Sequence, residues 1–81
     1  MELDLRGTGI WWIKKYLGDI GGVETAPDLI EGPGWSAVLT EGLHRAFGTD
    51  MPRVIVRFSG EPAAVAEAYR KLRLMAFRGG G

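Results

Sequence analysis

The sequence predicts a single α+β domain over residues 1–81, in which two helices cover one face of a curved antiparallel sheet. Three observations lead to this fold class. Residues Pro52–Phe58 alternate between two faces, as a strand does. Residues Pro62–Arg78 repeat apolar side chains at the three- and four-residue spacing of a helix. A length of 81 residues suits one domain. The expected order of elements is therefore strand, helix, four strands, helix.

The strand over residues 52–58 and the helix after it are expected to form the centre of the core. Val54, Val56 and Phe58 point to one face, while two arginines and an isoleucine between them point to the other. Pro62 suits the first position of the helix, where its missing N–H does no harm. Glycines end the helix. Its inner face should carry Val65, Ala68, Tyr69, Leu72, Met75 and Ala76.

The N-terminal part is expected to supply one strand and one helix. Residues 2–6 alternate, which predicts a short strand with Leu3 and Leu5 inward. Thr8 is the expected N-cap of a helix over residues 9–20, because its hydroxyl can accept a hydrogen bond from an unpaired N–H of the first turn.

The first helix is apolar around most of its circumference. Adjacent helix positions point about 100° apart, so Trp11 and Trp12 do not fit easily into one core. We expect one of them in the core and the other at the helix edge. A helix that is apolar on all sides needs cover on more than one side. The second helix, a partner chain or a ligand could supply that cover, and we predict a homodimer with Trp11 or Trp12 in the interface.

The middle of the chain is expected to hold short strands. Residues 23–31 indicate an edge strand or a bend around Pro27. Residues 35–40 suggest a strand, Glu41-Gly42 a tight hairpin turn, and residues 43–47 the partner strand.

The sequence is also compatible with an alternative fold. Residues Leu72–Phe77 alternate in part, so they are also compatible with a last strand. The fold would then be a ferredoxin-like sandwich.

Composition removes several function classes. The chain has no cysteine, which excludes disulfides, zinc-thiolate sites and thiol catalysis. Its 10 basic and 10 acidic residues give no net charge, so nucleic acid binding is disfavoured. No signal peptide and no apolar run of about 20 residues is visible, so we expect no membrane association and a cytoplasmic location.

The chain resembles a known family. The residues that carry the resemblance are Gly34-Trp35, the strand 52–58 and the stretch 72–80. They are similar to the C-terminal domain of proteins related to the molybdopterin synthase small subunit. The expected order of elements is also similar to the fold of one half of the TATA-binding protein. The resemblance brings no catalytic residues.

No residue pattern indicates catalysis. His44 is the only histidine and has no second metal ligand or paired nucleophile in view. We therefore predict a protein that is not an enzyme and that has no catalytic residue, metal site or cofactor.

The predicted interaction surface combines tryptophans and arginines. Several arginines could share one face of the sheet and, with the basic residues Arg70, Lys71 and Arg73, attract a phosphate or carboxylate. The alternative is an ordinary solvated charged face. The candidate residues are Trp11, Trp12, Arg45, Arg53 and Arg57.

Three functions remain open from the sequence. The first is a non-enzymatic binding or accessory domain, which the resemblance associates with molybdenum cofactor metabolism. The second is a sulfur-carrier-like protein, because Gly80-Gly81 is similar to the C-terminus of ubiquitin-like carriers. The third is a small-ligand binder that uses a groove between the sheet and the long helix.

Overall fold

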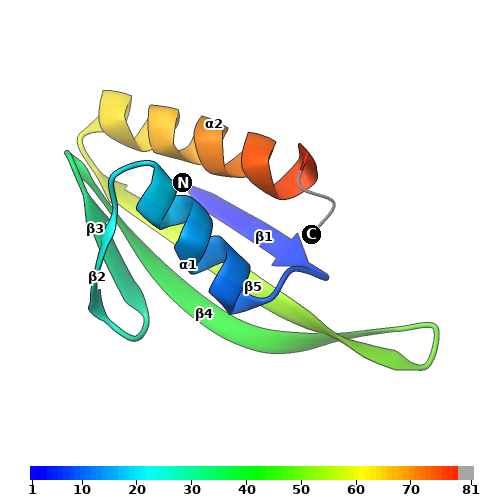
Figure 1. The fold of residues 1–81 in the computed structure, drawn as a ribbon. Helices are drawn as coiled ribbons and strands as arrows, with labels where there is room; N and C mark the ends of the chain where they lie inside the picture. The colour runs from blue at the N-terminus through cyan, green and yellow to red at the C-terminus, as the bar shows by residue number, and fades with distance from the viewer. Residues whose placement is uncertain (79–81) are drawn as a thin grey trace.

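A computed structural model describes residues 1–78 and contains an open, curved sheet of five antiparallel strands with two helices on one face (Figure 1). The strand order is β1-β5-β4-β3-β2. The predicted α+β fold and the predicted order of elements are confirmed. In chain order the elements are β1 (Glu2–Arg6), α1 (Ile10–Asp19), β2 (Val23–Ala26), β3 (Leu29–Gly32), β4 (Trp35–Ala46), β5 (Thr49–Gly60) and α2 (Pro62–Arg78).

Strand β5 lies at the centre of the core, as its alternation predicted. Val54 and Val56 are fully buried, and Phe58 is almost fully buried. Leu3 of β1 lies opposite Val56, and Leu5 lies opposite Val54. Because side chains directly opposite each other share a face, both strands direct their apolar side chains toward the helices.

The two helices divide this buried face between them. Helix α1 packs on β2, β3 and β5, and α2 packs on β1, β4 and β5. Helix α2 continues without a break to Arg78, so the ferredoxin-like alternative with a strand at 72–77 is wrong. The buried residues of α2 recur at three- and four-residue steps, as predicted, and are Val65, Ala68, Leu72 and Ala76.

Trp35, the first residue of β4, joins the helices to the sheet. Its side chain is buried and meets Phe58 edge to face, with 6.0 Å between ring centroids. Phe58 meets Tyr69 of α2 in the same way at 6.3 Å. The indole lies against Gly32 of β3, where any Cβ would collide with it. Gly32 is therefore required by the close approach of the ring.

The expected tight turn at Glu41-Gly42 is wrong. Strand β4 runs unbroken through both residues and pairs with β5 along its whole length. His44 consequently lies opposite Met51, whereas a two-residue turn at Glu41-Gly42 would place it opposite Leu39. The actual turn is at Phe47 and Gly48. The number of strands between the helices is four, as predicted, but they are divided differently. The strands expected at 35–40 and 43–47 are the single strand β4, and residues 23–31, expected as one edge strand or a bend, form β2 and most of β3.

The hairpin turn has an unusual residue in its first position. Phe47 and Gly48 have φ angles of 53° and 76°. Both lie in the left-handed region that a two-residue turn needs to match the twist of its strands. Glycine and asparagine adopt this conformation readily, whereas a bulky residue does so at a cost. Residue type predicts a turn over residues 48–50 from Gly48, whereas the turn in the structure is at Phe47 and Gly48.

The start of α1 also differs from the prediction. Gly9, and not Thr8, occupies the N-cap position, and no side chain caps the helix there. Thr8 is buried instead. Ile13 and Leu17 are fully buried, while Trp11 and Trp12 are both exposed. The expectation that one tryptophan enters the core is wrong, because the sheet covers only the side of α1 that carries Ile13 and Leu17.

The first prediction concerns the core. Replacing Phe58 by Ala removes the ring that contacts both Trp35 and Tyr69, and should lower the free energy of unfolding by about 3–5 kcal/mol. Phe77→Ala is the matched control, because Phe77 is largely exposed and should cost less than about 1 kcal/mol. Urea unfolding of both variants measures the difference. Equal stabilities would contradict this description of the core.

The second prediction concerns Gly32. Gly32→Ala should lower the free energy of unfolding by about 1–3 kcal/mol, because the new methyl group forces the Trp35 indole to move. Gly18→Ala makes the same chemical change in α1, where nothing lies within 4 Å of the added Cβ. That control should gain about 0.5–1 kcal/mol. A Gly32 variant as stable as the wild type would show that the ring does not lie there.

Candidate functional site

The surface of α1 carries an aromatic cluster formed by the exposed Trp11 and Trp12 and the partly buried Tyr16. Trp11 is 63% exposed and Trp12 is 45% exposed. Their rings meet edge to face with centroids 4.7 Å apart, and Trp12 lies 6.2 Å from Tyr16. The contacts keep the rings together on the surface. This aromatic cluster is therefore a preformed apolar surface.

A groove runs beside the aromatic cluster, between α1 and the β2–β3 hairpin. It has a volume of about 380 Å³, within the range of about 300–1,000 Å³ that is usual for ligand pockets. Glu24 of β2 and Lys14 form an ion pair at its side, at 2.5 Å. The residues that line the groove are Trp11, Lys14, Lys15, Gly18, Gly22, Glu24 and Ile30.

A second groove lies between the end of α1 and the start of α2, against Trp35. Ala64 and Ala68 give it apolar walls, and Glu67 and Lys71 give it a charged rim. Its volume is about 180 Å³, which is below the usual range for ligand pockets. It is the groove between sheet and long helix that the sequence suggested for a small ligand, and its size offers little support for that function.

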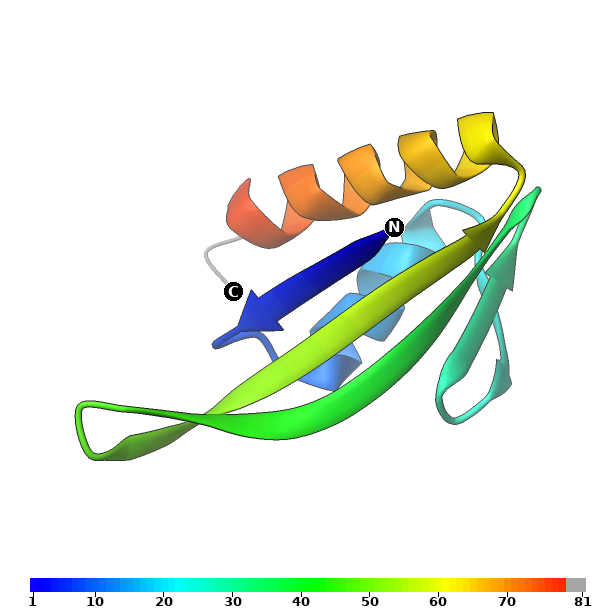
Figure 2. The same cartoon turned by 180° about the vertical axis from the view of Figure 1, so that it is seen from behind.

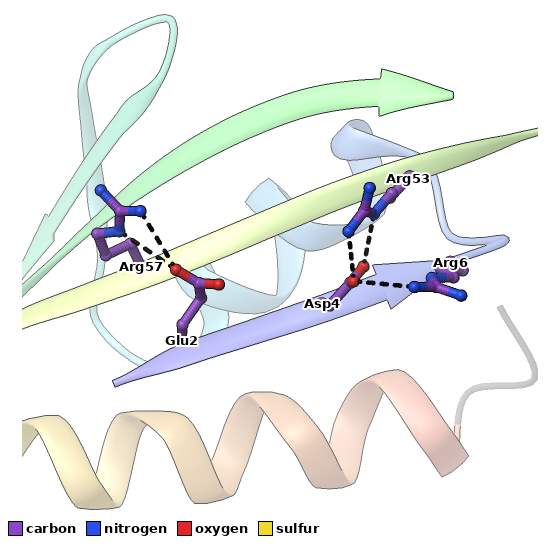
Figure 3. Close-up of polar contacts among 5 residues, drawn as sticks. All are labelled: Glu2, Asp4, Arg6, Arg53 and Arg57. Carbon is purple, nitrogen blue, oxygen red and sulfur yellow. Dashed lines mark hydrogen bonds and ion pairs between the residues drawn. The ribbon is translucent and has the colours of Figure 1, made fainter. Parts of the chain in front are cut away.

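The face of the sheet that the helices leave uncovered carries ion pairs between β1 and β5 (Figure 3). Two nitrogens of Arg53 donate to the Asp4 carboxylate, at 3.0 and 2.7 Å. Arg6 adds a longer contact to Asp4, at 3.4 Å. Arg57 donates to Glu2 at 3.3 Å. Both β5 arginines therefore have carboxylate partners within the chain.

The predicted basic face does not assemble. Arg53 and Arg57 share the uncovered face, but Arg45 lies opposite Asp50 near the hairpin turn, on the other side of the ladder by alternation. Arg70 and Lys71 pair with Glu67 on α2. The arginines thus stabilise existing contacts, and the structure does not gather them around a common ligand position.

The described residues offer no metal site and no membrane-spanning helix. Among residues 1–78, no three acidic or histidine side chains are grouped so as to hold a metal ion. Neither helix in this range is long and apolar enough to cross a lipid bilayer. Residues Gly80 and Gly81, on which the sulfur-carrier hypothesis depends, lie outside the described residues.

Comparison with models of protein families identifies a match. The model of the family described as archaeal MoaD-like protein matches residues 1–81, the full length of the sequence. A search of curated proteins finds no match.

The third prediction concerns Asp4. Hydrogen bonds from Arg53 lower the pKa of this carboxyl from its ordinary value of 3.8 to about 2. A pKa that folding depresses adds stability above the ordinary value, and that stability is lost as the pH falls from about 4 to about 2. An NMR titration should find the low pKa in the wild type and a higher pKa in Arg53→Gln, where Arg6 is the arginine that remains beside the carboxyl.

Glu67 provides the internal control for this titration. Its pKa is lowered by hydrogen bonds from Arg70, far from Arg53, and should be the same in both proteins. A pKa of Asp4 that does not respond to Arg53→Gln would contradict the ion pair.

Proposed function

Since the chain belongs to the archaeal MoaD-like protein family, we propose that it is a non-catalytic, cytoplasmic accessory domain that binds a protein partner in molybdenum cofactor or sulfur-carrier metabolism. The family supports the metabolic association. The surface of α1 supports the binding role, and it is the single observation that carries that part of the proposal.

The aromatic cluster has the composition of a protein-binding site. Trp and Tyr are enriched among the residues that contribute most to binding energy in interfaces. Trp11 and Trp12 together expose a large apolar area on one short helix, although Ile13 and Leu17 beneath them already complete the core. The tryptophans are therefore not needed for folding in the way that the buried residues are, which favours a role in binding.

The charged side chains around the groove indicate whether ionic or apolar contacts would contribute more to binding a partner. Lys14 pairs with Glu24, and Lys15 lies 3.6 Å from Asp19. A partner carboxylate would have to replace an existing exposed ion pair, and exchanges of that kind contribute little, since such pairs are worth about 0–1 kcal/mol. Burial of the two indoles would contribute more. We therefore expect the partner to present an apolar side chain to the groove.

A sulfur-carrier role is the second candidate, because the family description favours it. In the ubiquitin-like carriers that the sequence resembles at its last residues, the glycine tail follows a strand. Here α2 occupies the positions up to Arg78. Intact-mass spectrometry of protein from its native host tests the idea, since a carrier would have a thiocarboxylate on Gly81.

The fourth prediction tests the accessory role. The wild type and the variant Trp11→Ala should be crosslinked in extracts of the native host, and the captured proteins identified by mass spectrometry. We expect the wild type to capture a protein of molybdenum cofactor or sulfur-carrier metabolism, and Trp11→Ala to lose it, because the groove then lacks its aromatic wall.

Two comparisons make this experiment decisive. Leu74→Ala is the control, because Leu74 is exposed on α2, away from the groove. It should capture the same partner as the wild type. Capture of the same partner by Trp11→Ala would contradict the α1 surface. A thiocarboxylate on Gly81 with no tryptophan-dependent partner would replace the accessory role by the carrier role.

A further inference from the structure

Strand β4 has a free edge over Thr40–Ala46. On that side, β3 pairs with β4 only as far as Val38. The last contact is the hydrogen bond that Leu39 donates to the carbonyl of Asp28, at 2.8 Å. Beyond it, β4 pairs with β5 alone. The resulting two-stranded arm extends past both helices (Figures 1 and 2).

The backbone groups on this free edge can be assigned. The N–H of Leu39 points away from β5, toward Asp28. Peptide groups alternate in direction along a strand, so Glu41, Leu43 and Arg45 also direct their N–H and C=O groups outward. The intervening residues pair with β5. The edge therefore presents three residues whose main-chain donors and acceptors have no partner among residues 1–78.

The other edges of the sheet are short, bulged or interrupted by proline, whereas the only charged residues on this edge are Glu41 and Arg45, which have opposite signs. Strand β2 has a bulge and is followed by Pro27. Strand β1 has only five residues, three of them charged. The outer edge of β5 beyond β1 contains Pro52, which has no N–H to offer. The free part of β4 contains no proline, lysine or bulge, the usual means of blocking an edge.

The sequence of this edge is complementary to itself. We propose that two copies of the chain pair through Thr40–Ala46 as antiparallel strands about a two-fold axis at Leu43. In this register Glu41 lies opposite Arg45 of the second copy, and the same pair recurs across the axis. Leu43 lies opposite Leu43. Opposite charges directly across a ladder stabilise it, and an isologous contact forms each of them twice.

The backbone directions agree with this register. The three opposed pairs are the residues whose peptide groups point outward, so each pair can exchange two hydrogen bonds, about six in all. A register shifted by one residue would place outward-pointing groups opposite groups that already pair with β5. The free edge can therefore pair with a copy of itself only in registers where Glu41, Leu43 and Arg45 lie opposite residues whose peptide groups also point outward.

The pairing also explains the exposed apolar residues of the arm. Leu43 is 72% exposed and Phe47 is fully exposed. The register brings Phe47 level with Leu39 of the second copy, beside the Pro27-Asp28 turn that ends its free edge. A two-stranded ribbon alone is marginally stable in water, and two paired ribbons form four strands. This surface is separate from α1, so the inference does not rest on the proposed function.

The proposed dimer interface is small, so we expect the affinity between the two copies to be low. One shared strand edge buries less area than a standard protein interface. We expect a weak dimer that dissociates at low micromolar concentration and that weakens with added salt, because its ion pairs are exposed.

Charge reversal in two separate variants tests the register. Glu41→Arg places two arginines opposite each other on both sides of the axis, and Arg45→Glu does the same with two glutamates. Each variant alone should self-associate at least about tenfold more weakly than the wild type in sedimentation equilibrium. An equimolar mixture should form a heterodimer, because every opposed pair then has opposite charges. Circular dichroism confirms that both variants are folded.

Three results would overturn the proposal. The first is a wild type that remains monomeric at millimolar concentration. The second is a mixture of two folded variants that does not restore the dimer. The third is a dimer that Trp11→Lys dissolves and Glu41→Arg leaves intact, which would place the interface on α1, as the sequence first suggested.

Hydrogen exchange in the wild type gives an independent readout. The amides of Glu41, Leu43 and Arg45 should exchange slowly in concentrated protein and quickly after dilution. Those of Gly42 and His44 should be slow in both conditions, because they face β5. Exchange at the three outward amides that does not depend on protein concentration would contradict the pairing.

Discussion

The position of the Trp35 indole against Gly32 determines how the helices sit on the sheet. The ring spans the junction of β3, β4 and β5 and continues through Phe58 to Tyr69 of α2. A side chain on Gly32 would push the ring away, and a side chain on Gly22 would collide with both the ring and the carbonyl of Leu17. Gly22 and Gly32 therefore let the Trp35 ring pack closely against the backbone. This matters in a small domain, which has few residues to build a core.

The parts of the fold with strong periodicity were predictable. Apolar residues recur at the two-residue spacing of a strand in β1 and β5 and at the three- and four-residue spacing of a helix in α2. The residues that are buried in these elements are among those that the spacing predicted. Gly48 marks a turn near the end of the hairpin, but its exact position and the length of the hairpin were not predictable from local sequence. Glu41-Gly42 looks like a turn but is held in a long ladder, whereas the turn itself places Phe47 in a left-handed conformation. Tertiary pairing overrides the local preference in both places.

The candidate surfaces depend on long-range geometry, which limits what the sequence reveals about them. The sequence shows that two adjacent tryptophans, Trp11 and Trp12, do not fit easily into one core. That both are exposed follows from the positions of α2 and the sheet. The partner of Arg53 is Asp4, 49 residues away in sequence, and is fixed only by the register of β1 against β5. The free edge of β4 exists because β3 ends opposite Val38, and the local sequence does not predict that end.

The structure has one buried indole beneath the helices, Trp35, and two exposed indoles on α1, Trp11 and Trp12. Fluorescence with iodide as quencher measures this directly in the free protein at low concentration. The double variant Trp11→Phe, Trp12→Phe keeps Trp35 alone, and its emission should be blue-shifted and resist iodide, while Trp35→Phe should show red-shifted emission that iodide quenches readily. Protected tryptophans in Trp35→Phe, or an accessible Trp35, would contradict both the core and the binding surface described for this chain.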